Sequence, residues 1–478
     1  MNPQIALIVC TIFVLFLLTI EHRSFKDNSL AVWIPSIWLM LIASRPLGVW
    51  FGASEGGNEA GSALDRWVLS ALALAAVAVI LLRRFKWISI MKQHKWLVLL
   101  LGYMFLSTFW SDITLIALRR WVRELVFFIM ALTMMSENDP RYALESIVRR
   151  TAYVLLPFSL VLIKYYPQLG RQYGLFSGIE MWTGVTNQKN SLGRLCMISA
   201  IFLLFSIYRS WRDRKSGGKI LSKWADAVII FLAMYLLKGS NSATSLVCFT
   251  LGAFIFICFH QLRKLRITVP LTGILVLTIF LIAYGAATPL LGGKNVANYT
   301  SAVGRDSTLT GRTEVWALVV PAMQQKWLLG YGFGSFWTDA RRTLFDIPNA
   351  HNGYLDILLE MGLVGLVSYA LWLLSCAQKL RRALEHDYEW ASLGICLLLM
   401  NLIYNITESV LNSFTEHMTA TLALICLIVS RLQQESVRPL ALAGAIAAPE
   451  GEGRRRGRNA LGIVATSKQQ RLRRNASR

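Results

Sequence analysis

The chain has 478 residues, of which 55% are hydrophobic and only 16% are charged. An ordinary soluble domain has about a quarter of its residues charged, so this composition excludes a soluble globular enzyme. The net charge of +22 does not indicate binding to nucleic acid, because the basic residues are spread over many connections instead of one soluble face.

Apolar residues come in blocks of about 15–20 that are nearly free of charge, the length of a helix that crosses about 30 Å of hydrocarbon. The runs are continuous and do not alternate, which favours helices over a closed barrel. The sequence therefore predicts an all-α polytopic membrane protein with about 13 (12–14) transmembrane helices. The predicted spans lie near residues 4–20, 30–44, 67–82, 96–110, 120–135, 151–166, 191–208, 224–237, 243–260, 267–285, 353–374, 391–407 and 414–430.

Alternate connections between these spans differ in charge. The set that starts with 21–29 and ends with 431–478 holds 33 Lys or Arg, whereas the opposite set holds 13. By the positive-inside rule the first set is cytoplasmic, so the N-terminus and the long segments 167–190 and 287–352 face outward.

The segment 287–352 is far longer than a usual connection, and such loops are either functional or disordered. Its aromatic residues are too numerous for a solvated linker, which favours a small helical cap on the outer membrane surface. We expect a short helix over 313–324 and tight turns at Gly330, Gly332 and Gly334. The predicted parts are a transmembrane bundle (1–286), this loop (287–352), C-terminal transmembrane helices (353–432) and a poorly ordered basic cytoplasmic tail (433–478).

His351 is a candidate for chemistry because it lies in the outward loop directly before a predicted spanning helix. The positive end of that helix disfavours the imidazolium, so we expect a neutral side chain that can accept a proton. Asn349 and Asn352 suit the N-cap of the same helix. The alternative is that His351 only caps or anchors an interfacial helix. Glu360, about 13 Å further along the helix, is expected to be a structural hydrogen-bonding partner.

The outward-facing cations are a second group of candidates: Arg171, Lys189, Arg305, Arg312, Lys326, Arg341 and Arg342. The chain has no D-x-D pair and no outward His, Asp or Glu cluster with metal-ligand spacing. If the substrate carries a diphosphate, Arg and Lys must therefore neutralise it, with Arg offering a bidentate fork. Binding of membrane lipid headgroups by these cations is an equally open alternative.

Ionisable residues within the spans are costly in hydrocarbon and are therefore functional suspects as well. They are Arg123, Glu124, Lys164, Arg194, Asp226, Glu360 and Glu408.

Three stretches in and beside the outward segments contain motifs that are more specific together than any one of them is alone. The first is HNGYLDILLEMGLVGLVSY, from His351 to Tyr369, and the second is TGRTEVWALVVPAMQQKWLLGYGFGSF, from Thr310 to Phe336. The third combines Gly170–Arg171 with TNQKNSLG, from Thr186 to Gly193. In this order they resemble the O-antigen ligase and polysaccharide polymerase superfamily of bacterial inner membranes. Gln188 stands where members of that superfamily often have His.

The resemblance implies a GT-C-like bundle that carries out metal-independent, inverting glycosyl transfer on the periplasmic side, without a cofactor. The donor would be a glycan on polyprenyl diphosphate, and the acceptor a saccharide or lipid A-core. His351 resembles the proposed catalytic base, and Arg312 and Arg171 match arginines thought to hold the diphosphate. Lys189 is a candidate for the same role. The supporting residues implied are Asn190, Trp316, Asn352, Tyr354 and Glu360.

O-antigen ligase and repeat-unit polymerase both remain open on these motifs. A transporter or flippase of lipid-linked oligosaccharide is the alternative from another class, and it would place its binding groups near the middle of the membrane. The polar groups of this chain concentrate instead in one outward segment, which favours the enzyme.

Overall fold

The structure, a computed structural model, describes residues 2–52, 62–173, 180–212, 220–292, 312–345 and 347–431. All of them lie in one compact unit, Met1–Arg431. The predicted tail 433–478 and the candidate cation Arg305 lie outside the described residues.

The described residues are mainly helical. The first half contains α1 (Pro3–Ser24), η1 (Leu30–Val32), α2 (Trp33–Ala43), α3 (Leu47–Trp50), α4 (Ala63–Leu82), α5 (Trp87–Gln93), α6 (Lys95–Ser107), η2 (Thr108–Trp110), α7 (Thr114–Met135), α8 (Pro140–Tyr165), α9 (Pro167–Gly170) and α10 (Lys189–Arg212). Then follow α11 (Ile220–Gly239), α12 (Ala243–Lys264), α13 (Leu271–Leu290), α15 (Arg312–Gln325), α16 (Asp339–Phe345), α17 (Gly353–Ala383), α18 (Tyr388–Tyr404) and a final helix, His417–Arg431. Two short strands, β1 (Arg171–Tyr173) and β2 (Glu180–Trp182), pair antiparallel with Arg171 opposite Trp182.

Each predicted span overlaps one of these helices. Among the described residues, seven helices are long and apolar enough to cross a membrane: α1, α4, α8, α10, α12, α13 and α17. Four shorter apolar helices are Leu30–Ala43, Lys95–Trp110, Tyr388–Tyr404 and His417–Arg431. The prediction of an all-α membrane protein is therefore confirmed, while the count of about 13 spans stays a prediction.

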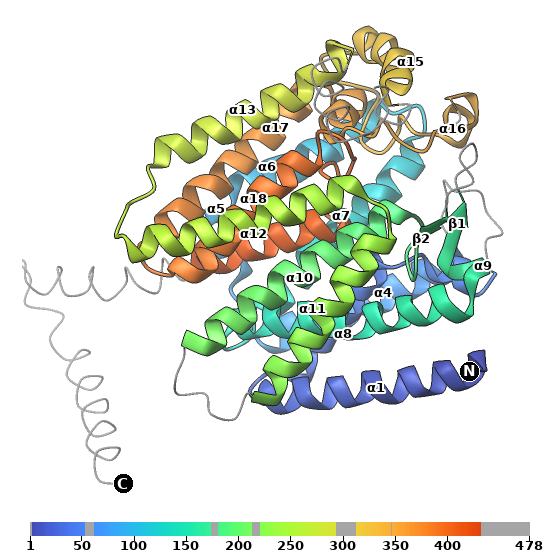
Figure 1. The fold of residues 1–478 in the computed structure, drawn as a ribbon. Helices are drawn as coiled ribbons and strands as arrows, with labels where there is room; N and C mark the ends of the chain where they lie inside the picture. Colours follow the sequence, from blue (N-terminus) through green and yellow to red (C-terminus); the bar gives the residue numbers. More distant parts are fainter. Residues whose placement is uncertain are drawn as a thin grey trace, which may run out of the picture. The chain divides into compact units, whose positions relative to one another are not determined.

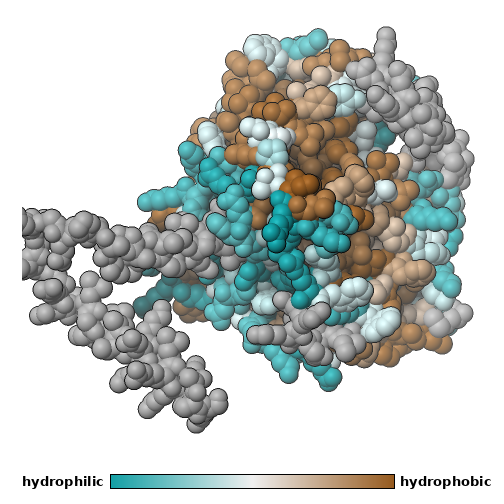
Figure 2. All heavy atoms as spheres, turned by 60° about the vertical axis from the view of Figure 1, so that its left-hand side comes forward, coloured by the Kyte–Doolittle hydropathy of each residue, from teal (hydrophilic) through white to brown (hydrophobic). Residues whose placement is uncertain are grey.

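The long helices run side by side, and the predicted outward segments gather at one end of them (Figure 1). This end, called the outward end below, carries the start of α1 together with α9, β1, β2, α15 and α16. The connection between α12 and α13 lies at the opposite end. Figure 2 turns that opposite end forward and shows hydrophilic side chains gathered beside apolar flanks.

The predicted tight turns lie against a kink in α17. Gly330, Gly332 and Gly334 have φ of +69°, +97° and +63°, a backbone conformation that favours glycine. At the kink, Gly362 has a φ of +63° and leaves the helical conformation. The opened backbone accepts hydrogen bonds from the turn, including one of 2.7 Å from Gly332 N to Glu360 O. The glycine-rich turn is thereby fixed on the helix that follows His351.

A buried ionic network joins α1, α8, α10 and α11. The guanidinium of Arg149 lies 2.7 Å from the carboxylate of Asp226, which also accepts a 2.6 Å hydrogen bond from the Tyr153 hydroxyl. Nε of Arg150 lies 2.9 Å from a carboxylate oxygen of Glu21. Each buried charge has an opposite partner, so the Asp226 carboxylate, a functional suspect in the sequence, has a structural role here.

Asp226→Ala should destabilise the protein by about 3 kcal/mol, because the buried Arg149 guanidinium would lose its 2.7 Å pair and keep only the 3.4 Å pair with Glu145. Thermal unfolding of the purified protein in detergent measures the effect. The control is Glu385→Ala, whose acid is 63% exposed and pairs with Arg381 at the surface. It should change stability by less than about 1 kcal/mol, and equal effects at both positions would contradict the assignment.

Candidate functional site

One buried carboxylate connects several of the predicted site residues. Glu408 lies between α18 and the final helix, and it is 4% exposed. Its Oε1 accepts a 2.7 Å hydrogen bond from Nδ2 of Asn190 and another from the guanidinium of Arg312. Its Oε2 lies 3.7 Å from Nδ1 of His351. The carboxylate thus joins the first turns of α10 and α15 to the residue that precedes the N-cap of α17.

The backbone around His351 is held in an uncommon conformation. Its φ is +48°, a left-handed value that costs about 1 kcal/mol or more for a residue with a side chain. The His351 amide donates to Oδ1 of Asn349 at 2.9 Å, and the amide of Ala350 donates to Oδ1 of Asp356 at 3.2 Å. Nε1 of the buried Trp316 donates to the Ala350 carbonyl at 2.9 Å. These contacts fix the backbone at His351, whose side chain remains 23% exposed and whose Nδ1 has no hydrogen-bond partner in the described structure.

Asn352 and Tyr354 fasten the start of α17 to its neighbours. Asn352 is the N-cap, as the sequence predicted, and its Oδ1 accepts a 2.8 Å hydrogen bond from the Leu355 amide. Its Nδ2 donates to the carbonyls of Gly285 in α13 and Ile406 beside Glu408, at 3.0 and 2.9 Å. The ring of Tyr354 packs directly against Gly285. A Cβ atom at position 285 would lie only 2.2 Å from this ring, so only glycine fits there. Both residues therefore support the position of His351 without facing solvent.

The environment keeps Glu408 charged. Burial alone would raise the pKa of its carboxyl, but the neighbouring His351 ring and the Arg312 guanidinium outweigh this effect and lower the pKa. Glu408 is therefore ionised at neutral pH. A carboxylate 3.7 Å from one ring nitrogen stabilises the positive charge that develops when the ring takes a proton.

The other predicted cations occupy different surroundings. Arg171 donates to the Ile163 carbonyl at 2.7 Å and forms a 3.0 Å ion pair with Glu180, contacts that tie β1 to α8 and β2. Within the described residues it makes no contact with Glu408. Lys189 is half-buried and begins α10, one residue before Asn190. The structure therefore places Arg312, and not Arg171, in contact with the carboxylate that lies 3.7 Å from His351.

Glu360 is a buried acid of α17, two residues before the kink at Gly362. The Glu360 side chain is 4% exposed, and its Oε2 has no hydrogen-bond partner in the described part of the chain. Its backbone carbonyl, by contrast, holds the glycine-rich turn described above.

Metal binding was a separate question raised by the sequence. Among the residues that the structure describes, no group of three or more His, Cys, Asp or Glu is placed to hold a metal ion.

Glu408 was not predicted as a site residue from the sequence. It was only one of the ionisable residues assigned to the spans. A signal was present in NITES, residues 405–409, a short polar stretch between two apolar segments. What the sequence does not show is that this stretch folds back onto the start of α17. Gly353 makes that contact, since its amide donates to the carbonyls of Asn405 and Glu408 at 2.9 Å each.

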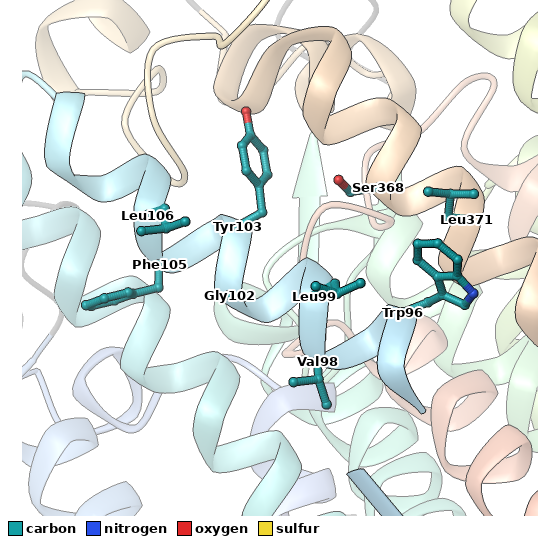
Figure 3. Close-up of a pocket in the computed structure, with 9 residues that line it drawn as sticks. All are labelled: Trp96, Val98, Leu99, Gly102, Tyr103, Phe105, Leu106, Ser368 and Leu371. Carbon is teal, nitrogen blue, oxygen red and sulfur yellow. The ribbon is translucent and has the colours of Figure 1, made fainter. Parts of the chain in front are cut away.

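An apolar groove lies on the flank of α17. Its volume is about 540 Å³, and it is lined by side chains of α6 and α17, among them Trp96, Leu99, Tyr103 and Leu371 (Figure 3). The Tyr103 hydroxyl donates to the Met361 carbonyl at 2.8 Å, beside the kink. No charged side chain lines the groove in the described structure, so its surface suits hydrocarbon and not ionic chemistry.

Fold and site together define a multi-pass helical membrane protein with a His–Glu–Arg cluster at the outward end of its helices. Residues 227–370, which include Arg312 and His351, match the O-antigen ligase family. These matched residues confirm the resemblance to the O-antigen ligase superfamily that the motifs indicated.

Two relatives agree with this result. The chain is 25% identical over 307 residues to the exopolysaccharide production protein ExoQ of Rhizobium meliloti, which covers 62% of this chain and 67% of that protein. It is 30% identical over 224 residues to a Rickettsia typhi protein with the provisional name polysaccharide ligase. That second alignment covers 38% of this chain and 53% of the relative.

Proposed function

We propose that this protein is a glycosyltransferase that moves a glycan from a polyprenyl-diphosphate donor to an acceptor saccharide, with inversion and without a metal or cofactor. The observation that carries the proposal is the contact of Glu408 with both His351 and Arg312. The match to the O-antigen ligase family and the names of the two relatives support polysaccharide assembly as the process.

The reaction is a single displacement. His351 takes the proton of the acceptor hydroxyl while that oxygen attacks the anomeric carbon of the donor sugar. The bond from this carbon to the diphosphate oxygen breaks, and its electron pair leaves with the polyprenyl diphosphate. Arg312 stabilises the charge that develops on the leaving oxygen, and the Glu408 carboxylate stabilises the imidazolium. Attack from the face opposite the leaving group inverts the anomeric centre.

The location of the cluster supports a lipid-linked substrate. His351 lies just before α17, and Arg312 is the first residue of α15. Both are at the outward end of long apolar helices. A polyprenyl diphosphate has its head group at the membrane surface and its chain in the hydrocarbon, so the reactive bond and the cluster lie at comparable depth. We propose the bacterial inner membrane as the location and its periplasmic face as the reactive side, on the basis of the charge difference between alternate connections.

Purified protein in lipid nanodiscs, given a defined polyprenyl-diphosphate oligosaccharide, tests this function. The products are separated by size on a gel. A ladder of lengths identifies a polymerase, whereas one shifted band with added lipid A-core identifies a ligase. Movement of the lipid-linked oligosaccharide across the bilayer without any covalent product would contradict the proposal in favour of a transporter.

Arg312→Lys should lower turnover by about 10-fold or more, because an ammonium group cannot replace the bidentate fork of a guanidinium. The matched control is Arg341→Lys. Arg341 donates to the Phe336 carbonyl at 3.1 Å and pairs with Asp112 at 3.4 Å, away from Glu408. Initial rates of both variants at saturating donor decide the question, and equal losses would show that only a generally cationic surface matters.

A chelator such as EDTA should leave the transfer rate of the purified protein unchanged, since the proposed reaction uses guanidinium groups where other transferases use a divalent ion. The rate is measured before and after chelation and again after Mg²⁺ is added back. Strong inhibition that Mg²⁺ reverses would overturn the metal-independent mechanism.

A further inference from the structure

A second polar pocket lies near the cluster and is not used by the proposed reaction. It is a partly enclosed cavity of about 110 Å³, below the roughly 300–1,000 Å³ of pockets that enclose a whole small molecule, so it has room for one edge of a sugar ring and not for an oligosaccharide. Its walls come from the end of α2, the stretch before α10, α10 itself and the start of the final helix. The polar lining residues are Ser44, Thr186, Asn187, Ser191, Arg194, Glu416 and His417.

His417 is the unusual member of this lining. Its side chain is 2% exposed, yet neither ring nitrogen has a hydrogen-bond partner in the described part of the protein. A buried polar group without a partner costs roughly 1–3 kcal/mol, so native structures rarely keep one without a function or a bound molecule. His417 is therefore a polar group that a ligand in the pocket would satisfy.

The charges of the pocket indicate the class of ligand. The guanidinium of Arg194 lies 2.7 Å from the carboxylate of Glu416, so these two groups neutralise each other. A pocket with a paired Arg and Glu, hydroxyls and amides does not select a free anion. It offers donors and acceptors side by side, which suits the hydroxyl groups of a neutral sugar.

The pocket also adjoins the cluster through α10. Asn190, which donates to Glu408, and Arg194 are four residues apart and so lie on one face of that helix. The connection that carries both Glu408 and Glu416 is fixed by the buried Glu124, which accepts a 2.7 Å hydrogen bond from the Phe414 amide. A group bound in the pocket would therefore keep a constant position relative to His351.

We propose that this pocket is a saccharide subsite in which His417, Arg194 and Glu416 bind hydroxyl groups of one neutral sugar residue beside the transferred bond. The inference rests on the proposed function and names the part of the substrate that these residues recognise. The sugar belongs either to the donor glycan or to the acceptor, and the two sources are distinguished by experiment.

The main variant is His417→Leu, which removes both ring nitrogens at similar volume. Binding is measured in nanodiscs on a His351→Asn background, so that no turnover occurs. Three probes are titrated: the polyprenyl-diphosphate oligosaccharide, the oligosaccharide released from its lipid, and polyprenyl diphosphate without sugar. We expect the Kd of one or both sugar-bearing probes to rise about 10-fold, while the Kd of the sugar-free lipid stays unchanged.

In the active protein the same change should raise KM and leave kcat within about twofold, since binding and not chemistry is weakened. The substrate whose KM rises identifies the sugar as donor or acceptor. His417→Gln, which keeps a donor and an acceptor, should recover most of the affinity. His94→Leu is the control, because this second buried histidine contacts Lys379 on α17, with no contact to the pocket lining.

Equal weakening of all three probes, or no change in any of them, would overturn the subsite. If His417→Leu fails to fold, Glu416→Gln provides the same test, because this second member of the proposed subsite has a side chain that is 35% exposed and lies outside the core. Loss of the subsite is distinguishable from loss of the proposed function. Wild-type protein that binds the sugar-bearing probes and forms no covalent product refutes the transferase, while the binding result still stands.

Discussion

Replacing His351 with Ala should lower glycan transfer by at least about 100-fold while the protein still inserts and folds, because the acceptor hydroxyl loses its base. A second variant, His351→Asn, separates chemistry from backbone conformation. Asn tolerates the left-handed backbone that His351 adopts at φ +48°, but it cannot accept the proton. Both variants should therefore be equally inactive in the product assay.

The control is His386→Ala, which changes an exposed histidine in the connection that follows α17 and should leave the rate unchanged. Activity that survives in His351→Asn and fails only in His351→Ala would show that the residue matters for the conformation before α17. In that case the alternative drawn from the sequence, a residue that only anchors an interfacial helix, would be correct.

Glu408→Gln should reduce turnover by about 100-fold or more with little change in donor binding, because the amide keeps the shape but not the charge. Without the carboxylate, nothing in the cluster compensates the positive charge that forms on the imidazole in the transition state. Single-turnover rates at saturating donor and the Kd of the donor measure the two quantities separately.

The matched control is Glu389→Gln. Glu389 also bonds to arginines, with Arg263 at 3.4 Å and Arg212 at 3.3 Å, but it lies in the first turn of α18 and not at the cluster. It should retain nearly full activity. A Glu408→Gln protein with normal kcat would show that this acid serves packing only.

The membrane class was predictable because the constraint that hydrocarbon places on a spanning helix acts within one short segment of the chain. Every backbone group within a span must be paired inside its own helix, and this requirement produces long charge-free runs that are visible in the sequence. The N-cap at Asn352 and the turns at Gly330, Gly332 and Gly334 were predictable for the same reason, since each depends on a few consecutive residues.

The two short strands in the segment 167–190 and the ionic partner of Asp226 were not predicted. Both depend on residues that are separated in the chain: Arg149 and Asp226 meet only because α8 packs against α11. A local pattern marks such a residue as costly in hydrocarbon, but it does not reveal whether the cost is offset by a partner or serves a reaction.

The sequence by itself determined the helical membrane class, the alternation of basic connections, and the identities of His351 and Arg312 as candidates, because these follow from composition and short motifs. Only the tertiary structure decided which cation shares a carboxylate with the histidine. Glu408 is 96 residues from Arg312 and 57 from His351, and its carboxylate meets both only after the connection between α18 and the final helix has folded against the starts of α15 and α17. The physical reason is that the counter-charges of a buried carboxylate are its neighbours in space and not in sequence. No periodicity along the chain indicates which residues they are.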